Sequence, residues 1–225
     1  MRMKKIMMIA AMMVAAVSAN AQFEPGTFSI QPKAGATISW LSNLPSNSDI
    51  SKSPAVGAIF GAEAEYQLTE QFSVAAGVNY AQQGSGFDDY TLKYGDYESS
   101  VKDIKYELGY VNIPVVANFY AFKGFAIKAG IQCGFVTNAK FKYTASESNA
   151  GNKKTVDFDE DIKDECSKFD LSIPIGVSYQ VPTVPIVIDM RYNLGLLKVN
   201  KESEAGHDDM KNNMIQLTVG YKFAL

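Results

Sequence analysis

The chain has 225 residues and a formal net charge of −3, with 24 acidic and 21 basic residues. Nucleic-acid binding requires a basic face, so this mildly acidic composition predicts no nucleic-acid partner. Two cysteines, Cys133 and Cys166, are too few for a disulfide scaffold. They fall many residues out of register in the strand pairing proposed below, and a disulfide needs Cα atoms within about 7 Å. We therefore expect two free thiols.

The N-terminus has the three parts of a secretory signal peptide. Residues 1–5 are basic, residues 6–17 are apolar, and Ala19-Asn20-Ala21 forms an A-x-A cleavage site. The apolar stretch is too short to cross a bilayer as a helix. We expect residues 1–21 to be removed and residues 22–225 to form a single mature domain.

Beyond the signal peptide, two-residue alternation predicts strands with one large apolar face and one small or polar face. In the segment 125–143, for example, odd positions are mostly large and apolar, while even positions are mostly small or polar. The same pattern predicts strands over 28–40, 56–68, 72–80, 106–119, 125–143, 168–181, 186–196 and 215–223.

One predicted strand changes phase. Tyr106, Leu108 and Tyr110 occupy even positions, whereas the apolar residues from Ile113 onwards occupy odd positions. A β-bulge near Val111-Asn112 would add one residue and exchange the two faces. The alternative is that this strand begins later and that its first half belongs to a loop.

Pro114 and Pro174 each follow an isoleucine inside a long predicted strand. Proline cannot donate a hydrogen bond to a ladder, so we expect a local bulge or kink at each. We interpret both as structural features that set the curvature of a barrel rather than as functional hinges.

The connections between the predicted strands alternate in length. Residues 68–71, 122–124 and 182–185 form tight turns, whereas 41–53, 83–103, 145–165 and 200–211 are longer. Short turns at one end and long loops at the other are typical of bacterial outer-membrane barrels. The sequence therefore predicts an all-β, eight-stranded antiparallel up-and-down transmembrane β-barrel with short periplasmic turns and long extracellular loops.

Side-chain volume indicates which face meets lipid. Eight strands enclose a space that side chains just fill, and the large apolar face would overfill it. Aromatic residues also gather near the strand ends, like the girdles at the two bilayer interfaces. The alternative is a soluble periplasmic barrel or sandwich. We expect an outer-membrane monomer whose partners are membrane lipid and, during biogenesis, the barrel-assembly machinery.

The small face would line the lumen and carries charges of both signs. Buried charges must be paired, so we expect cross-lumen salt bridges that plug the barrel and prevent efficient ion conduction. The predicted lumen charges are Lys33, Lys128, Lys140, Lys168, Arg191 and Lys222 against Glu63, Glu65, Glu107, Asp170 and Asp189.

Three segments, 108–116, 171–176 and 189–196, carry a strand–Ile-Pro–strand signature and an Arg-Tyr-Asn-x-Gly-Leu run. In these motifs the chain resembles the PorT-like, porin-family outer-membrane β-barrel domain over roughly residues 22–225. The resemblance implies an outer-membrane barrel, usually without an assigned activity, and links some members to protein secretion. The chain departs from the usual aromatic C-terminus of such barrels, because Phe223 is followed by Ala224-Leu225.

Two of the long loops contain candidate binding residues. Asp157, Asp159 and Asp161 could attract calcium, although Ile162 and Lys168 stand where an EF-hand loop needs glycine and glutamate, and a solvated acidic face is the commoner outcome. Phe87, Tyr90, Tyr94 and Tyr97 form a candidate interaction surface for glycan, peptide or protein. The alternative for these aromatics is a β-hairpin extension in which they pack on one another.

We expect neither a cofactor nor enzymatic activity. The single histidine lies in His207-Asp208-Asp209, where a His-Asp pair could act as a general base but more simply forms part of a solvated loop. Three classes of function remain: a structural or surface-interaction barrel meeting surface glycan or an envelope protein, an accessory of a secretion machine, and a narrow solute channel or barrel enzyme. We favour the first.

Overall fold

A computed structural model describes residues 24–42, 52–95, 97–149, 152–200 and 210–225. The predicted signal peptide and the His207-Asp208-Asp209 segment lie outside the described residues. Within them the chain forms eleven strands and no helix that is long and apolar enough to cross a membrane. The strands are Phe28–Ser42 (β1), Lys52–Gln67 (β2), Phe72–Phe87 (β3), Tyr90–Tyr94 (β4), Tyr97–Phe122 (β5), Phe125–Asn149 (β6), Asn152–Asp161 (β7), Phe169–Gln180 (β8), Ile186–Gly195 (β9), Lys211–Tyr221 (β10) and Phe223–Ala224 (β11).

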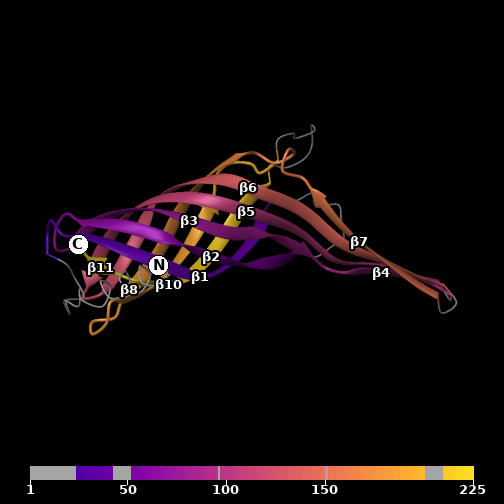
Figure 1. The fold of residues 1–225 in the computed structure, drawn as a ribbon, viewed down its shortest axis with the longest axis horizontal. Coiled ribbons are helices and arrows are strands. Elements are labelled where there is room, and N and C mark those ends of the chain that lie inside the picture. Colours follow the sequence, from indigo (N-terminus) through magenta and orange to yellow (C-terminus); the bar gives the residue numbers. More distant parts are fainter. Residues whose placement is uncertain (1–23, 43–51, 96, 150–151, 201–209) are drawn as a thin grey trace, which may run out of the picture.

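Eight of the described strands form a closed ring. Their order is β5-β3-β2-β1-β10-β9-β8-β6, and pairing of β5 with β6 closes it (Figure 1). All eight pairings are antiparallel. Each joins barrel strands that follow one another along the chain, except that β1 pairs with β10, the first barrel strand with the last. The prediction of an eight-stranded up-and-down barrel is therefore confirmed.

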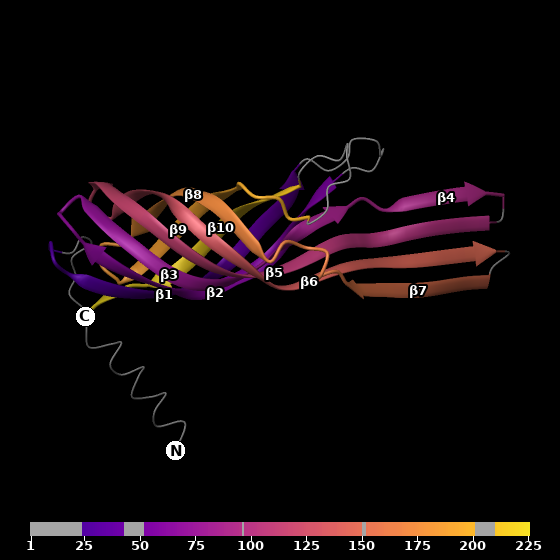
Figure 2. The same cartoon turned by 90° about the horizontal axis from the view of Figure 1, so that it is seen from above.

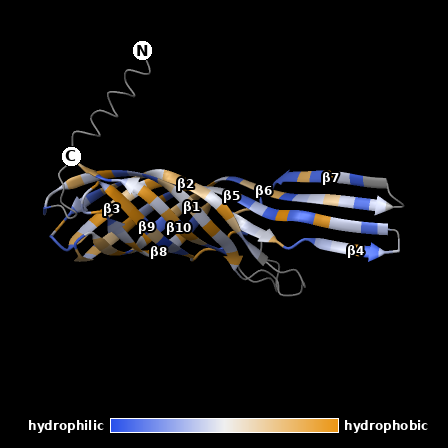
Figure 3. Ribbon diagram, turned by 90° about the horizontal axis from the view of Figure 1, so that it is seen from below, coloured by the Kyte–Doolittle hydropathy of each residue, from blue (hydrophilic) through white to orange (hydrophobic). Residues whose placement is uncertain are grey.

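Alternate residues of each barrel strand face the lumen and the outside. On β10, Leu217 and Val219 are 52% and 53% exposed, whereas Gln216 and Thr218 are buried. Figure 3 shows hydrophobic and hydrophilic residues interspersed in this way along the barrel strands. Large apolar side chains on the outside and polar side chains within are the reverse of a soluble protein and match a barrel immersed in lipid.

The two ends of the barrel differ. The short connections and the C-terminus lie at one end, here called the turn end, and β4 and β7 lie at the other (Figure 1). Outward Phe28 and Trp40 on β1 mark the two ends. At about 3.3 Å per residue and a tilt of about 40°, they are separated by about 30 Å along the axis, close to the thickness of a bilayer core.

Paired aromatic rings occupy both ends of the outer surface. Phe122 and Phe125 stack at the turn end with ring centroids 4.7 Å apart, and Trp40 stacks on Tyr192 at the other end at 6.0 Å. Aromatic pairs of this kind are favoured at the two membrane interfaces.

β5 has no bulge near Val111-Asn112, contrary to our prediction, and its apolar pattern changes phase because Leu108 and Tyr110 are apolar residues that face the lumen. Inward positions run through Leu108, Tyr110 and Asn112 without a break. The extra residue lies on β6, where Thr137 is left unpaired between the Gly109–Asn138 and Tyr110–Val136 pairs. β6 therefore exchanges its faces at Thr137, and the predicted outward face of 125–143 is wrong beyond that residue.

The prolines do not shift the register, contrary to our expectation of a bulge or kink. β8 pairs with β9 in one constant register through Pro174. Its pairing with β6 is interrupted between Ala129–Ile175 and Gln132–Ser172 and resumes in the same register. Pro114 interrupts the β3 pairing in the same manner. Each proline therefore costs hydrogen bonds on one side of its strand only.

Two of the predicted long loops are strands. β5 and β6 continue beyond the barrel, with β4 pairing along the outer edge of β5 and β7 along the outer edge of β6. These four strands form a sheet that leaves the barrel along its long axis (Figure 2). We call this sheet, comprising β4, residues 97–107 of β5, residues 139–149 of β6 and β7, the extension.

The lipid-facing orientation predicts a large penalty for a charge in the middle of the outer surface. Leu217→Arg should lower the free energy of unfolding by about 2–4 kcal/mol, because the guanidinium would face hydrocarbon. The measurement is urea unfolding in lipid vesicles, followed through the fluorescence of Trp40, the chain's one tryptophan. Leu217→Ile is the matched control, and equal midpoints for the two variants would contradict the orientation.

Candidate functional site

The centre of the lumen is crossed by a two-pronged ion pair. Arg191 of β9 donates two hydrogen bonds to Glu63 of β2, from Nη1 to Oε1 and from Nη2 to Oε2, each 2.7 Å long. Arg191 Nη2 also donates to Asp189 Oδ2 at 2.8 Å. All three side chains are at most 3% exposed. Bidentate pairing of this kind fixes the planar guanidinium as well as neutralising it.

Two lysines complete this layer. Lys33 Nζ of β1 lies 2.5 Å from Glu63 Oε1, and Lys128 Nζ of β6 lies 2.6 Å from Asp189 Oδ2. The layer thus joins β1, β2, β6 and β9 across the lumen. Because unpaired buried charges are costly, each member holds its partners in place.

A second group of polar side chains lies nearer the turn end. Lys222 Nζ is 2.8 Å from Glu65 Oε2 and 3.1 Å from the Tyr120 hydroxyl. Tyr120 also donates to Glu65 Oε1, as does Ser73 at 2.6 Å. We call this group and the Arg191 layer together the ion network. Its charged members are Lys33, Glu63, Glu65, Lys128, Asp189, Arg191 and Lys222.

The remaining predicted lumen charges lie elsewhere. Glu107 and Lys140 belong to the extension. Glu107 is on the outward side of β5, whose alternation is unbroken there, whereas the face exchange at Thr137 of β6 turns Lys140 away from the lumen. Lys168 is exposed in the segment before β8. Asp170 is half-buried near the start of β8, and its Oδ1 accepts a hydrogen bond from the Leu171 amide at 2.8 Å. Among the described residues Asp170 forms no ion pair.

Amide side chains follow the ion network toward the extension. Asn112 Nδ2 donates to Asn79 Oδ1 at 3.2 Å, and Asn212 Nδ2 donates to Gln83 Oε1. All four side chains are buried. This uncharged layer connects β3, β5 and β10 within the lumen.

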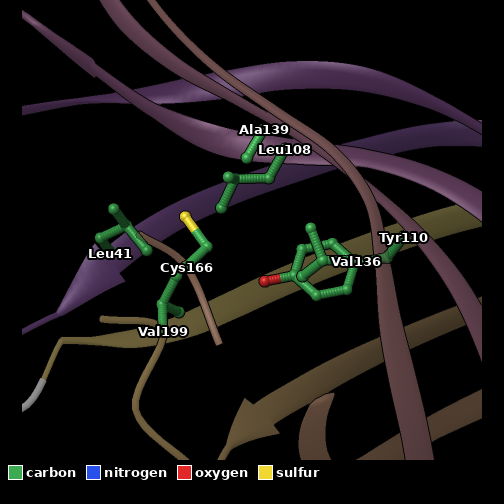
Figure 4. Close-up of a cluster of buried hydrophobic side chains, with 7 residues drawn as sticks. All are labelled: Leu41, Leu108, Tyr110, Val136, Ala139, Cys166 and Val199. Carbon is green, nitrogen blue, oxygen red and sulfur yellow. The ribbon is translucent and has the colours of Figure 1, made fainter. Parts of the chain in front are cut away.

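An apolar cluster closes the sequence of layers at the extension end of the barrel (Figure 4). Leu108 and Tyr110 of β5 converge there with Cys166 and Val199, which lie in the connections outside the barrel strands. Sequence analysis missed this apolar cluster, although the even-numbered run of Leu108 and Tyr110 was its signal. Its members are Leu41, Leu108, Tyr110, Val136, Ala139, Cys166 and Val199. Cys133 and Cys166 are not joined in a disulfide bond.

The barrel wall is also irregular at the seam between β2 and β3. Their register shifts between Pro54 and Ile59, and a hollow of about 390 Å³ lies beside it. The Gln82 side chain spans the seam, since its Oε1 accepts a hydrogen bond from the Ala58 amide at 3.2 Å. Thr37 Oγ1 donates to the Gln82 carbonyl from inside at 2.5 Å. Gln82 thus replaces part of the missing backbone pairing.

One face of the extension is aromatic. Tyr106 contacts Phe141 with ring centroids 4.9 Å apart, Phe141 contacts Tyr143 at 5.5 Å, and Tyr143 stacks on Phe158 at 4.5 Å. Register places Tyr90, Val101, Ala145 and Val156 in one row across the four strands, on this same face. We call it the aromatic face. It continues the side of β5 that faces the lumen within the barrel.

The predicted interaction residues of the second loop divide between two places. Tyr90, Tyr94 and Tyr97 lie on the extension and are 51%, 89% and 40% exposed. Phe87 ends β3 and instead packs edge-on against Tyr106 at 5.8 Å. The β-hairpin of the alternative prediction is present as β4 and the start of β5, but these three tyrosines take part in none of the ring contacts found among the described residues.

The opposite face of the extension is charged. Lys142 Nζ lies 2.7 Å from Glu107 Oε2, and Lys105 Nζ lies 3.0 Å from Glu107 Oε1. Partial burial raises the pKa of Glu107, but hydrogen bonds from Lys142 and Lys105 outweigh this effect and leave the pKa below its ordinary value. We call this side the charged face.

The candidate calcium ligands lie on the charged face, each with a different partner. Asp157 Oδ1 accepts from Thr144 at 2.8 Å, Asp159 Oδ1 lies 3.0 Å from Lys140 Nζ, and Asp161 Oδ1 accepts from the Lys163 amide at 2.9 Å. Alternate residues of one strand do not converge on a point. The described residues contain no group of three or more side chains placed to hold a metal ion, and these three aspartates therefore do not form one.

A closed antiparallel ring with an apolar exterior and a charged lumen defines an outer-membrane β-barrel. Residues 20–200 match the family model described as outer membrane protein beta-barrel domain, and the chain belongs to that family. The protein is therefore located in the outer membrane.

Among solved structures the chain is similar to Ail, the attachment invasion locus protein of Yersinia pestis, with 17% identity and a TM-score of 0.44 over 88% of this chain and 99% of Ail. Neisserial surface protein A has 17% identity and a TM-score of 0.43, covering 87% of this chain and 97% of its own. OprG from Pseudomonas aeruginosa has 12% identity and a TM-score of 0.43, covering 92% and 99%. No curated protein matches the chain.

Breaking the central ion pair should destabilise the barrel strongly. Glu63→Gln removes the carboxylate that neutralises Arg191 and Lys33, and leaving buried charges unpaired costs about 3–5 kcal/mol. Glu98→Gln, in the exposed Lys93–Glu98 pair of the extension, should cost less than about 1 kcal/mol. Urea unfolding in vesicles compares the two variants, and equal losses would show that the ion network does not stabilise the barrel.

Proposed function

We propose that this protein is a non-enzymatic outer-membrane barrel with a plugged lumen, which holds the extension outside the cell as an interaction surface. The single observation that carries the proposal is the exposed aromatic face. Water-exposed tyrosines and aliphatic residues on a rigid sheet offer large contact areas at low entropic cost. The partner classes that this surface suits are surface glycan and an envelope protein.

The layers of side chains in the lumen support the proposal that the barrel is plugged. Paired charges, buried amides and the apolar cluster follow one another from the turn end to the extension end. An ion crossing the barrel would have to displace the Arg191–Glu63 pair and then pass side chains that offer it no ligand. Two successive barriers of different chemistry favour a scaffold over a narrow solute channel.

The resemblance to PorT-like barrels supports a second candidate, an accessory role in protein secretion. One observation weakens it. The Arg-Tyr-Asn-x-Gly-Leu run supplies Arg191 to the ion network and Tyr192 to the outer aromatic pair with Trp40. These contacts give the motif a structural reason to exist in any such barrel. Loss of secreted proteins after deletion of the gene would favour this second candidate.

Conductance in planar bilayers tests the plugged lumen. The wild-type protein should give no large, stable single-channel steps. Leu108→Ala/Tyr110→Ala, which removes the apolar cluster's central residues, should remain closed because the ion network is intact. Adding Glu63→Ala and Arg191→Ala to that variant should open a conducting path. Stable conductance of the wild-type barrel would contradict the proposal outright.

A barrel-only variant tests the role of the extension. Replacing residues 88–103 and 142–160 with two-residue Asn-Gly turns removes the outer part of the four-stranded sheet and keeps the ring. This variant should still migrate as a folded, heat-modifiable barrel on electrophoresis. It should nevertheless fail to rescue the envelope-integrity defect of a deletion strain, whereas the wild-type gene should rescue it. Full rescue by the barrel-only variant would overturn the proposed function.

A further inference from the structure

The extension ends in an edge strand with a free side. β7 is the last strand of the sheet order and pairs only with β6 within the described part of the chain. Its 10 residues contain neither proline nor glycine, and the side chains from Lys154 to Asp161 are exposed. The opposite edge strand, β4, has only 5 residues. A long exposed edge offers backbone groups for pairing with another strand.

The charges along β7 are distributed unevenly. Lys154 lies near its start, while Asp157, Asp159 and Glu160 lie in its second half. Alternate residues share a face, so Lys154, Val156, Phe158 and Glu160 all lie on the aromatic face. Within the described residues neither Lys154 nor Glu160 takes part in an ion pair. Such a strand complements a second copy of itself running in the opposite direction.

We propose that β7 pairs with β7 of a second copy of this protein, antiparallel and centred on Asp157. In this register Lys154 faces Glu160 and Val156 faces Phe158, and the two-fold axis repeats both pairs. A shift of two residues in one direction would set Lys154 against Phe158, and in the other would set Val156 against Glu160. A shift of one residue would set the aromatic face against the charged face. The register at Asp157 is therefore the favoured one.

The orientation of the barrels then follows. The strands of the extension run along the long axis of the barrel (Figures 1 and 2). Antiparallel β7 strands consequently place the two barrels at opposite ends of the joined sheet. Two copies in one membrane, related by an axis along the bilayer normal, would have parallel strands and could not pair in this way. The partner is thus a copy in a facing membrane, and the contact joins two cells.

One pair in this register is unfavourable. Asp157 meets Asp157 at the axis, and like charges directly opposite each other destabilise a sheet. Each of these carboxylates is hydrogen-bonded to Thr144 Oγ1 at 2.8 Å. The proposal therefore requires that Asp157→Asn strengthen self-association, which distinguishes this register from those in which residue 157 faces another side chain.

Cysteine crosslinking tests the register directly, in a Cys133→Ala/Cys166→Ala background whose folding is checked by heat-modifiability. Asp157→Cys places two thiols opposite each other within disulfide reach and should crosslink at least about tenfold faster than Tyr94→Cys at the exposed tip. Asp159→Cys, which faces Thr155 in the proposed register, is the matched control on the same strand and should behave like Tyr94→Cys. Equal rates for all three variants would overturn the pairing.

Exchanging the charges of Lys154 and Glu160 tests whether these pairs hold the two copies of β7 together. Lys154→Glu and Glu160→Lys should each slow crosslinking of Asp157→Cys by about tenfold, because two attractive pairs become repulsive. The double exchange should restore the rate. Failure of the double variant to recover would contradict the proposed pairing even if each single variant is impaired.

Mixing two cell populations with differently tagged copies tests the facing-membrane geometry. Crosslinks should join the two tags, and crosslinks confined to one tag would overturn this geometry. The pairing of β7 rests on the proposed role of the extension as an interaction surface, but the experiments can disprove either one without the other. If β7 does not self-associate while the barrel-only variant still cannot rescue the deletion strain, the extension functions with a different partner.

Discussion

Hydrocarbon offers no hydrogen-bond partner to a backbone amide, and the whole arrangement of this chain depends on that constraint. Pairing of β5 with β6 closes the ring and gives every barrel strand two neighbours. Charged residues must then face inward, where Arg191 meets Glu63 from a strand 128 residues away in the sequence. The same pair that hides two charges from lipid therefore also ties β9 to β2. Beyond the bilayer the constraint ends, and β5 and β6 continue without the other six barrel strands.

Alternation was sufficient to predict the barrel, because lipid and lumen impose opposite demands on successive residues of every strand. The sequence could not locate the β6 bulge, since a phase conflict between neighbouring strands does not reveal which strand holds the extra residue. Leu108 and Tyr110 indicated the apolar cluster in the lumen rather than a bulge. An apolar side chain on the lumen side looks like a phase change when, as here, the lumen has its own apolar cluster.

The charges of the ion network were predictable from their position on the small face of strands with unbroken phase, as for Lys33, Glu63 and Arg191. Lys140 was misplaced because it lies beyond the bulge at Thr137 of β6, and Glu107 because its apolar neighbours Leu108 and Tyr110 were assigned to the outward face of β5. The extension was hidden by its composition. Its segments are rich in serine, asparagine and acidic residues, which favour loops, and strand formation there depends on cross-strand pairing that a single sequence does not display.

The face exchange at Thr137 also affects how such a protein can change over time. Of the barrel strands only β5 and β6 continue into the extension, so its outer part can lengthen or shorten without altering the contacts of the ion network. Adding or removing two residues in each strand keeps every side chain on its own face of the extension. Adding or removing one residue would move the tyrosines of the aromatic face onto the charged face. The extension can therefore diversify in even steps while the barrel within the membrane stays fixed.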